Sequence, residues 1–192
     1  MVGATNTHSA GTKIHRKPMS RTQPLIIPCR NFTPQIDTSC WLAPNATVVG
    51  DVVMGAESSC WFQAVIRGDV APIRIGKRVN IQDGAIIHGT FEKSETVIED
   101  DASIGHQAVV HGAHIKCGAL VGMGAVVMDG AVVGEHAVVA AGAVVLAGTI
   151  IPDHSLWAGV PAKQRGVVNE SLREHLAATS ARYVEYADWF RD

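Results

Sequence analysis

The stretch IKCGAL-VGMGAV-VMDGAV-VGEHAV-VAAGAV-VLAGTI, residues 115–150, decides the fold of this 192-residue chain. A branched aliphatic residue opens each block of six, and a small residue stands four places later. The pattern runs through Ile115, Val121, Val127, Val133, Val139, Val145 and Ile151, with Ala119, Ala125, Ala131, Ala137, Ala143, Thr149 and Ser155. An α-helix would need apolar spacings of three and four, and a simple alternating strand a spacing of two. A period of six is typical of a parallel β-helix.

The same period extends toward the N-terminus. Its leading positions are Ile36, Leu42, Val48, Met54, Cys60, Ile66, Ile75, Ile81, Ile87, Ile98, Ile104 and Val110. The spacing departs from six only three times: it is three residues longer after Ile66, five longer after Ile87 and one shorter after Val110. We therefore predict an all-β solenoid over residues 24–166 that contains a few local irregularities.

The composition narrows the class of protein. Apolar residues make up 47% and aromatic residues 5%, with 19 glycines, which suits closely stacked strands with small side chains. A net charge of −2 and the lack of a basic run interleaved with aromatics argue against a nucleic-acid partner. The longest uncharged run, residues 137–152, is shorter than the ~20 residues of a membrane span. No membrane association is expected.

The ends of the chain differ from its body. We predict a disordered extension over residues 1–23, which contains basic residues and no acidic ones. The cysteines, Cys29, Cys40, Cys60 and Cys117, form no CxxC pair, which favours reduced thiols and a cytoplasmic location. A basic, acid-free start is also found in organelle transit segments, so targeting to an organelle stays as the alternative.

A C-terminal α-helix is predicted over residues 167–192. Ser171-Leu172-Arg173-Glu174 matches a capping box. One helical stripe then follows, formed by Leu172, Leu176, Thr179, Tyr183, Tyr186 and Phe190. We expect the helix to pack along the solenoid, with Trp189 and Phe190 as its anchor.

Three histidines, His88, His106 and His111, lie beside the irregular spacings. A regular scaffold has no internal need for imidazoles there, and three imidazoles hold Zn²⁺ or another first-row ion while leaving a fourth position for water. His88 and His111 each follow a leading aliphatic residue directly, whereas His106 stands two places after Ile104. Extended chain from 106 to 111 spans ~15 Å, and a corner lies between these residues, so one chain is not expected to bring all three histidines around one ion. A second copy of the chain is therefore expected to supply the third ligand.

Further polar residues are candidates to support such a site. Arg67 and Asp69 are expected to pair with each other or across a subunit boundary. The alternative is an interface salt bridge that has no catalytic role. Gln82 and Asp83 precede His88 by one turn of the pattern. The alternative for Gln82 is a purely structural role, as a hydrogen-bonding residue at a corner of the solenoid.

The motifs Ile66-Arg67-Gly68-Asp69, Asn80-Ile81-Gln82-Asp83-Gly84, Ile87-His88, Ile104-Gly105-His106 through Val110-His111-Gly112, and Ala158-Gly159-Val160-Pro161-Ala162-Lys163 carry a resemblance. Together they resemble the γ-class carbonic anhydrase family, over roughly residues 30–192. The resemblance implies a left-handed parallel β-helix with three hexads per coil, assembled as a homotrimer. With that coil length, all three irregular spacings fall on one edge, and Arg67, His88 and His111 stack on successive coils.

The resemblance also implies the chemistry. Zn²⁺, or Fe²⁺ or Co²⁺, would be held by His88 and His111 of one subunit and His106 of its neighbour. Arg67 and Asp69 would pair across the interface, and Gln82 would orient the metal-bound hydroxide that converts CO₂ to bicarbonate.

The sequence departs from the archetype of this family at three places. Val70 stands where the archetype has a glutamate, and Trp157 where many relatives have a tyrosine. The loop from residue 89 to 96 is short, and Glu92 and Glu95 are its only candidate proton shuttles. Two alternatives to CO₂ hydration therefore stay open. One is an acyl-CoA thioesterase or acyltransferase, and the other a non-catalytic metal-binding trimeric scaffold.

Overall fold

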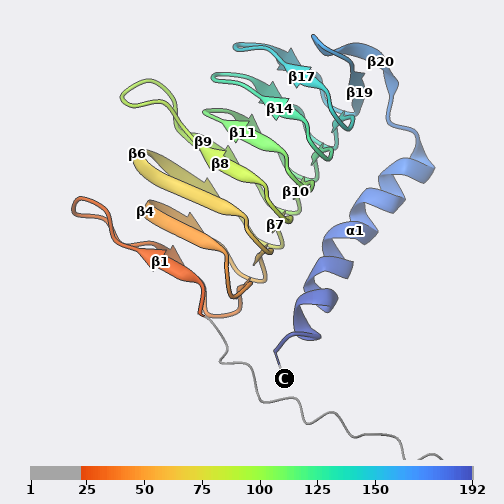
Figure 1. Ribbon diagram of the computed structural model, residues 1–192. Helices are drawn as coiled ribbons and strands as arrows, with labels where there is room; N and C mark the ends of the chain where they lie inside the picture. The colour runs from red at the N-terminus through yellow and green to blue at the C-terminus, as the bar shows by residue number, and fades with distance from the viewer. Residues whose placement is uncertain (1–22, 192) are drawn as a thin grey trace, which may run out of the picture.

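The computed structural model describes residues 23–191 and forms a three-sided parallel β-solenoid flanked by one helix (Figure 1). Residues 1–22 and 192 lie outside the described residues, so the predicted N-terminal extension falls almost wholly outside them.

The strands line three faces of a prism. The first face holds β2 (Gln35–Ile36), the second half of β4 (Thr47–Met54), the second half of β6 (Val65–Ile75), β9 (Thr96–Ile98), β12 (His114–Ile115), β15 (Val132–Val133) and β18 (Ile150–Ile151). The second face holds β3 (Trp41–Leu42), β5 (Ser59–Cys60), β7 (Asn80–Ile81), β10 (Ser103–Ile104), β13 (Leu120–Val121), β16 (Val138–Val139) and β19 (Ser155–Ala158), which β20 (Lys163–Val167) joins antiparallel. The third face holds β1 (Leu25–Ile27), the first halves of β4 and β6, β8 (Ile86–His88), β11 (Val109–His111), β14 (Val126–Val127) and β17 (Val144–Val145).

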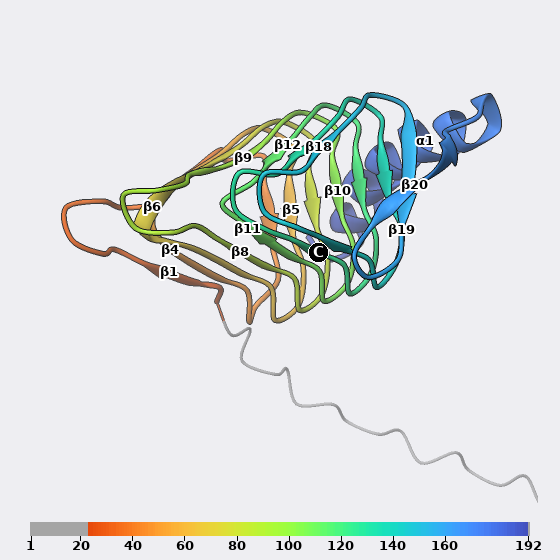
Figure 2. The ribbon, with the colours of Figure 1, turned by 90° about the horizontal axis from the view of Figure 1, so that it is seen from above.

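Apart from β20, each strand pairs in parallel with the strand one coil away. Ile104 pairs with Val121 and Val110 with Val127, so a coil contains three hexads. Seen from above, the chain passes from β10 to β11 to β12 clockwise as it rises toward the viewer (Figure 2). The predicted left-handed parallel β-helix is confirmed.

The irregular spacings all fall on the edge between the third and first faces, here called the irregular edge. β4 and β6 run through this edge without a turn, and the register of their pairing shifts between Gly50 and Val52. Gly50 has φ = 73°, and a Cβ there would collide with the backbone of Gly68 on the next coil. The loop after β8 and the short link after β11 form the same edge higher up.

The core follows the sequence frame. The leading aliphatics Ile66, Ile104 and Val127 and the small residue Ala125 are fully buried. Burial of each large aliphatic side chain stabilises the fold by roughly 1.5–3 kcal/mol. Ile73, inside the long spacing after Ile66, is also fully buried although it has no place in the six-residue frame.

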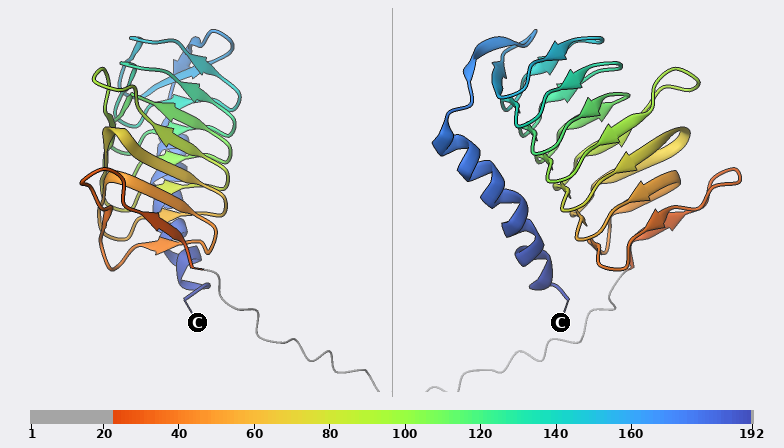
Figure 3. Two further views of the ribbon diagram at one scale, coloured as in Figure 1. Left: turned by 60° about the vertical axis from the view of Figure 1, so that its left-hand side comes forward. Right: turned by 180° about the vertical axis from the view of Figure 1, so that it is seen from behind.

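The helix α1 (Glu170–Asp188) runs back along the second face toward the N-terminal end of the solenoid (Figures 1 and 3). Its cap is Asn169, whose side chain accepts a hydrogen bond from Leu172 N at 2.9 Å, so the capping box predicted at Ser171 is wrong. Asn169 takes the cap position two residues earlier and leaves Ser171 in the first turn. The helix, which is the one among the described residues, is not apolar enough to cross a membrane.

The C-terminal anchor consists of one of the two predicted aromatic residues. The Phe190 ring lies 5.1 Å from Trp41 and 5.7 Å from Phe62, centroid to centroid. Trp189 is 65% exposed and lies against Tyr186 of its own helix instead. Of the two predicted anchor residues, Phe190 is therefore the one that packs on the solenoid.

Candidate metal centre

His88 and His111 face each other on adjacent coils. They are direct partners in the parallel pairing of β8 with β11, because both follow a leading aliphatic residue on the third face. His88 Nδ1 lies 3.1 Å from His111 Nε2. The side chain of His88 is 15% exposed and that of His111 33%, so the pair opens to solvent at the irregular edge.

A carboxylate stands behind each of these rings. Asp69 Oδ1 is 3.1 Å from His88 Nε2, and Asp129 Oδ1 is 3.2 Å from His111 Nδ1. A neutral imidazole has one N–H group, and a carboxylate accepts a hydrogen bond from it. When the outer nitrogens donate to Asp69 and Asp129, both inner nitrogens keep their lone pairs, and they lie 3.1 Å apart.

The facing nitrogens fit a metal ion. Two nitrogen ligands of a tetrahedral Zn²⁺, each ~2.0–2.1 Å from the ion, lie about 3.3 Å apart. The observed separation of 3.1 Å is close to that value. Histidines backed by carboxylates are also the usual arrangement around bound metals.

Arg67 lies beside the pair. Its guanidinium forms an ion pair with Asp69, and its Nη2 is 3.5 Å from His88 Nδ1. Partial burial by itself would raise the pKa of Asp69, but hydrogen bonds from Arg67 and His88 keep that pKa below its usual value. The resemblance implies that Arg67 and Asp69 pair across subunits, whereas here they pair within one chain, two residues apart on β6.

His106 lies at a different edge, between the second and third faces. Its Nδ1 is 2.8 Å from Asp83 Oδ2, which leaves Nε2 available. Its backbone N–H donates to Gln82 Oε1 at 3.2 Å, and the buried Gln82 donates to Asn80 Oδ1 at 2.9 Å. Gln82 and Asp83 therefore position His106 and its loop in this structure.

The third face separates His106 from the other two histidines. His106 stands before β11 begins, and His111 is its last residue. Within residues 23–191 of a single chain, no three His, Cys, Asp or Glu side chains form a metal-binding group. The structure thus brings two of the three predicted ligands together and holds the third at the far end of the same face.

The outside of the third face and its two ends carry exposed apolar side chains. Ile86, Met123, Met128 and Leu146 are 43%, 58%, 38% and 51% exposed. Met123 stands at the same corner position as His106, one coil higher, because each follows its leading aliphatic by two places. An exposed apolar strip rimmed by polar residues is typical of a protein–protein contact.

The loop after β8 connects to the site through Asp129, a residue that the sequence analysis missed. Thr90 Oγ1 donates to Asp129 Oδ1 at 2.8 Å, and the Ser94 hydroxyl donates to the same oxygen. Burial alone would raise the pKa of Asp129, but these hydroxyls and His111 lower it to about 2. Strand register could have identified this residue, since it directly follows Met128, the position one coil above His111. The predicted shuttles Glu92 and Glu95 are exposed on this loop.

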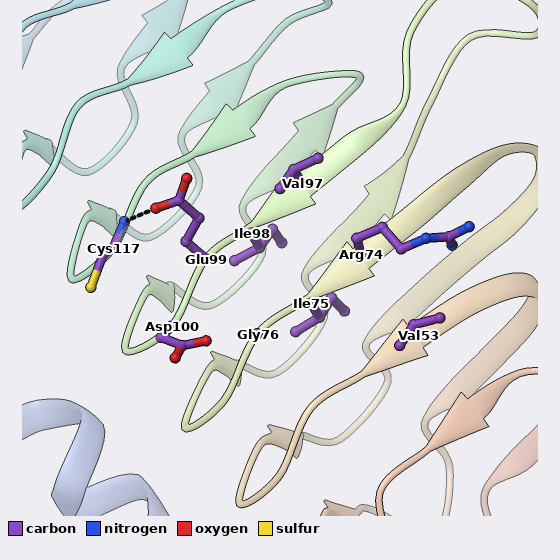
Figure 4. A pocket seen from close by; sticks show the side chains of 9 residues that line it. All are labelled: Val53, Arg74, Ile75, Gly76, Val97, Ile98, Glu99, Asp100 and Cys117. Atoms are coloured by element: carbon purple, nitrogen blue, oxygen red, sulfur yellow. Dashed lines mark hydrogen bonds between the residues drawn. The ribbon is translucent and has the colours of Figure 1, made fainter.

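Two clefts flank this loop region. One, of about 320 Å³, is lined by Asp69, Val70 and Pro72 together with Arg30 and Phe32. The other, of about 480 Å³, includes Glu92 and Glu95. A separate hollow of about 460 Å³ lies on the first face (Figure 4), where Glu99 accepts a hydrogen bond from Cys117 N at 3.0 Å. None of the predicted site residues lines that hollow, so it is not the candidate centre.

Comparison with known proteins points to one family. The model for bacterial transferase hexapeptide (six repeats) matches residues 112–147. A protein named "Probable carbonic anhydrase" from Methanocaldococcus jannaschii is 48% identical over 147 residues, covering 77% of this chain and 92% of that protein. The mitochondrial gamma carbonic anhydrase 3 of Arabidopsis thaliana is 44% identical over 160 residues, covering 81% of this chain and 62% of the relative.

Other comparisons carry a transferase name or are partial. A crystal structure of a Bacillus cereus protein, assigned provisionally as an acetyltransferase, has a TM-score of 0.85 and 40% identity. It covers 88% of this chain and 97% of that chain. For several curated relatives the matched part spans only 52–58% of the relative's own length.

Proposed function

The chain belongs to the γ-class carbonic anhydrase family, and from this premise we propose that it is a metal-dependent enzyme that interconverts CO₂ and bicarbonate. The observation that carries the proposal is the pair of facing nitrogens of His88 and His111, 3.1 Å apart and backed by Asp69 and Asp129. Imidazoles backed by carboxylates are suited to holding a metal ion.

A homotrimer would complete each site. His106 and the His88–His111 pair lie at opposite ends of the third face, so packing that face against the next copy puts His106 beside a neighbour's pair. The exposed apolar strip on that face supports the packing. Zn²⁺, Fe²⁺ or Co²⁺ would then have three imidazole ligands and one open position.

The ion would supply Lewis acidity, which makes water nucleophilic near neutral pH. The residues of the chain orient the ligands, balance charge and remove the released proton. Asp69, Asp83 and Asp129 hold the three imidazoles in orientation. Arg67 balances the charge of Asp69. Glu92 and Glu95, exposed beside the site, would carry the released proton to solvent.

Stopped-flow measurement of CO₂ hydration tests the proposal. Protein loaded with Zn²⁺, Fe²⁺ or Co²⁺ should exceed the buffer rate, and the His111→Ala variant prepared in the same way should not. No rate above buffer with any of the three ions would refute it.

A second candidate is acyl transfer to or from a thioester, since the hexapeptide model and the Bacillus cereus neighbour carry transferase names. The apolar wall formed by Val70, Ala71 and Pro72 in the cleft beside Asp69 favours a substrate with an apolar part. Acyl-CoA turnover that survives both chelation and His106→Ala would support this candidate. A trimer that binds metal and turns over neither substrate would instead be a scaffold.

A cytoplasmic location belongs to the same proposal. All four cysteines lie in the described part of the chain and are free thiols, as in a reducing compartment. The Arabidopsis relative is named as mitochondrial, so cell fractionation that finds the protein in an organelle would overturn this point.

A further inference from the structure

Asp129 is the meeting point of three segments. It accepts hydrogen bonds from His111 Nδ1 at 3.2 Å, from Thr90 Oγ1 at 2.8 Å and from the Ser94 hydroxyl. His111 ends β11, Asp129 follows β14 one coil higher, and Thr90 and Ser94 belong to the loop after β8. One carboxylate therefore connects a candidate metal ligand to the loop beside it.

We propose that Asp129 is a positioning residue that fixes the ring and the tautomer of His111, and that the loop of residues 89–95 holds Asp129 in place. Only the tautomer with its proton on Nδ1 can donate to this carboxylate, and that tautomer keeps the Nε2 lone pair free for a metal ion. The inference rests on the metal site of the proposed function and deepens it.

The loop is built to deliver two hydroxyls to one point. The backbone N–H of Ser94 donates to Thr90 O at 3.1 Å, and the backbone N–H of Thr90 donates to Ser94 Oγ at 3.2 Å. These bonds close a tight turn. Its tip residues Phe91, Glu92 and Lys93 are exposed, while Thr90 and Ser94 are half-buried and face Asp129.

Gly112 gives independent evidence that Ser94 holds Asp129 in place. It directly follows His111, has φ = 57°, and lies against the contact between Ser94 and Asp129. A Cβ at this position would collide with both Ser94 Oγ and Asp129 Oδ1. The absence of a side chain at residue 112 is what lets the hydroxyl reach the carboxylate.

A thermodynamic coupling follows. If the loop stabilises the metal-binding form of His111, then an ion on His111 must stabilise the loop by the same free energy. Metal binding should therefore slow amide hydrogen exchange in residues 89–95, which lie outside the β-strands. Loss of the two hydroxyls should weaken metal binding even though neither of them touches the ion.

The test uses full-length Asp129→Asn, the double variant Thr90→Val with Ser94→Ala, and Asp153→Asn as the matched control. Asp153 also accepts a hydrogen bond, from Glu135 N at 2.8 Å, but it stands on another edge. Zn²⁺ affinity is measured by chelator competition. We expect a 10–100-fold loss for Asp129→Asn, about fivefold for the double variant, and no change for the control.

Two further readouts separate positioning from mere stability. The ¹⁵N NMR spectrum of His111 in metal-free protein should show the Nδ1-protonated tautomer in wild type and a mixture in Asp129→Asn. Zn²⁺ should slow hydrogen exchange in the loop of the wild-type protein and less in the double variant. If Asp129→Asn does not fold, the double variant and its loop exchange decide.

Zn²⁺ affinity within twofold of wild type in Asp129→Asn, or an unchanged tautomer, would overturn the inference. A wild-type protein that binds no Zn²⁺, Fe²⁺ or Co²⁺ would instead refute the proposed function. The tautomer would still test Asp129 in that case, so the two failures are distinguishable.

Discussion

Replacing Ala125 with leucine should destabilise the solenoid strongly. Ala125 is fully buried, and the residues at the same position one coil below and one coil above are Ala108 and Ala143, also fully buried. Coils are ~4.8 Å apart, and carbon atoms in contact need ~3.5–4.0 Å, so about 1 Å of slack remains along the axis. Leucine needs far more room than that.

We expect a loss near the upper end of the range for overpacked cores, about 3 kcal/mol. For a domain of this size that loss lowers Tm by roughly 6–12 °C. Thermal unfolding followed by circular dichroism measures it at matched protein concentration. Ala177→Leu, on the exposed side of α1, is the control and should leave Tm nearly unchanged. An unaltered Tm for Ala125→Leu would show that the inward register is wrong.

Three further predictions concern the metal, the assembly and the acid stability. His106→Ala should lower the metal content several-fold, because two imidazoles from one chain leave an incomplete shell; full occupancy by elemental analysis would contradict the ligand assignment. Chelation should shift the solution mass from trimer toward monomer if the ion contributes to assembly, and light scattering would detect this. Hydrogen bonds from Arg78 lower the pKa of Asp101 despite partial burial. The contribution of ionised Asp101 to the free energy of unfolding is therefore present above the unfolded pKa of ~3.9 and is lost as the pH falls. Asp101→Asn should therefore cost about 1 kcal/mol at pH 7 and progressively less as the pH falls below the unfolded pKa. Urea unfolding at neutral and acid pH would refute this if the cost were equal.

The repeat specified most of the fold because its period is set by geometry. Each hexad supplies one large and one small inward side chain, so Ile104 and Ala125 could be placed in the core from spacing alone. The irregular spacings predicted one edge for the same reason. Ile73 could not be found in this way, because β6 crosses that edge as continuous strand and brings an additional residue into the core.

The contacts in the candidate site that strand register determines were predictable from the sequence. The contacts that depend on side-chain conformation were not. The pairing of His88 with His111 follows from the coil length. Arg67 and Asp69 were expected to pair, but whether they do so within one chain depends on rotamers. The cap at Asn169 depends on local competition between polar side chains. Asp129 looked like an ordinary turn residue, since its role depends on a loop 35 residues away.

Mixing two inactive variants tests the central claim most directly. His106→Ala lacks one ligand, and the double variant His88→Ala with His111→Ala lacks the other two. If each site takes its ligands from two neighbouring copies, about one quarter of the sites in trimers reassembled from an equal mixture should have all three ligands, so the mixture should bind more metal than either variant alone. A mixture that binds no more metal than its separate components would contradict the shared site.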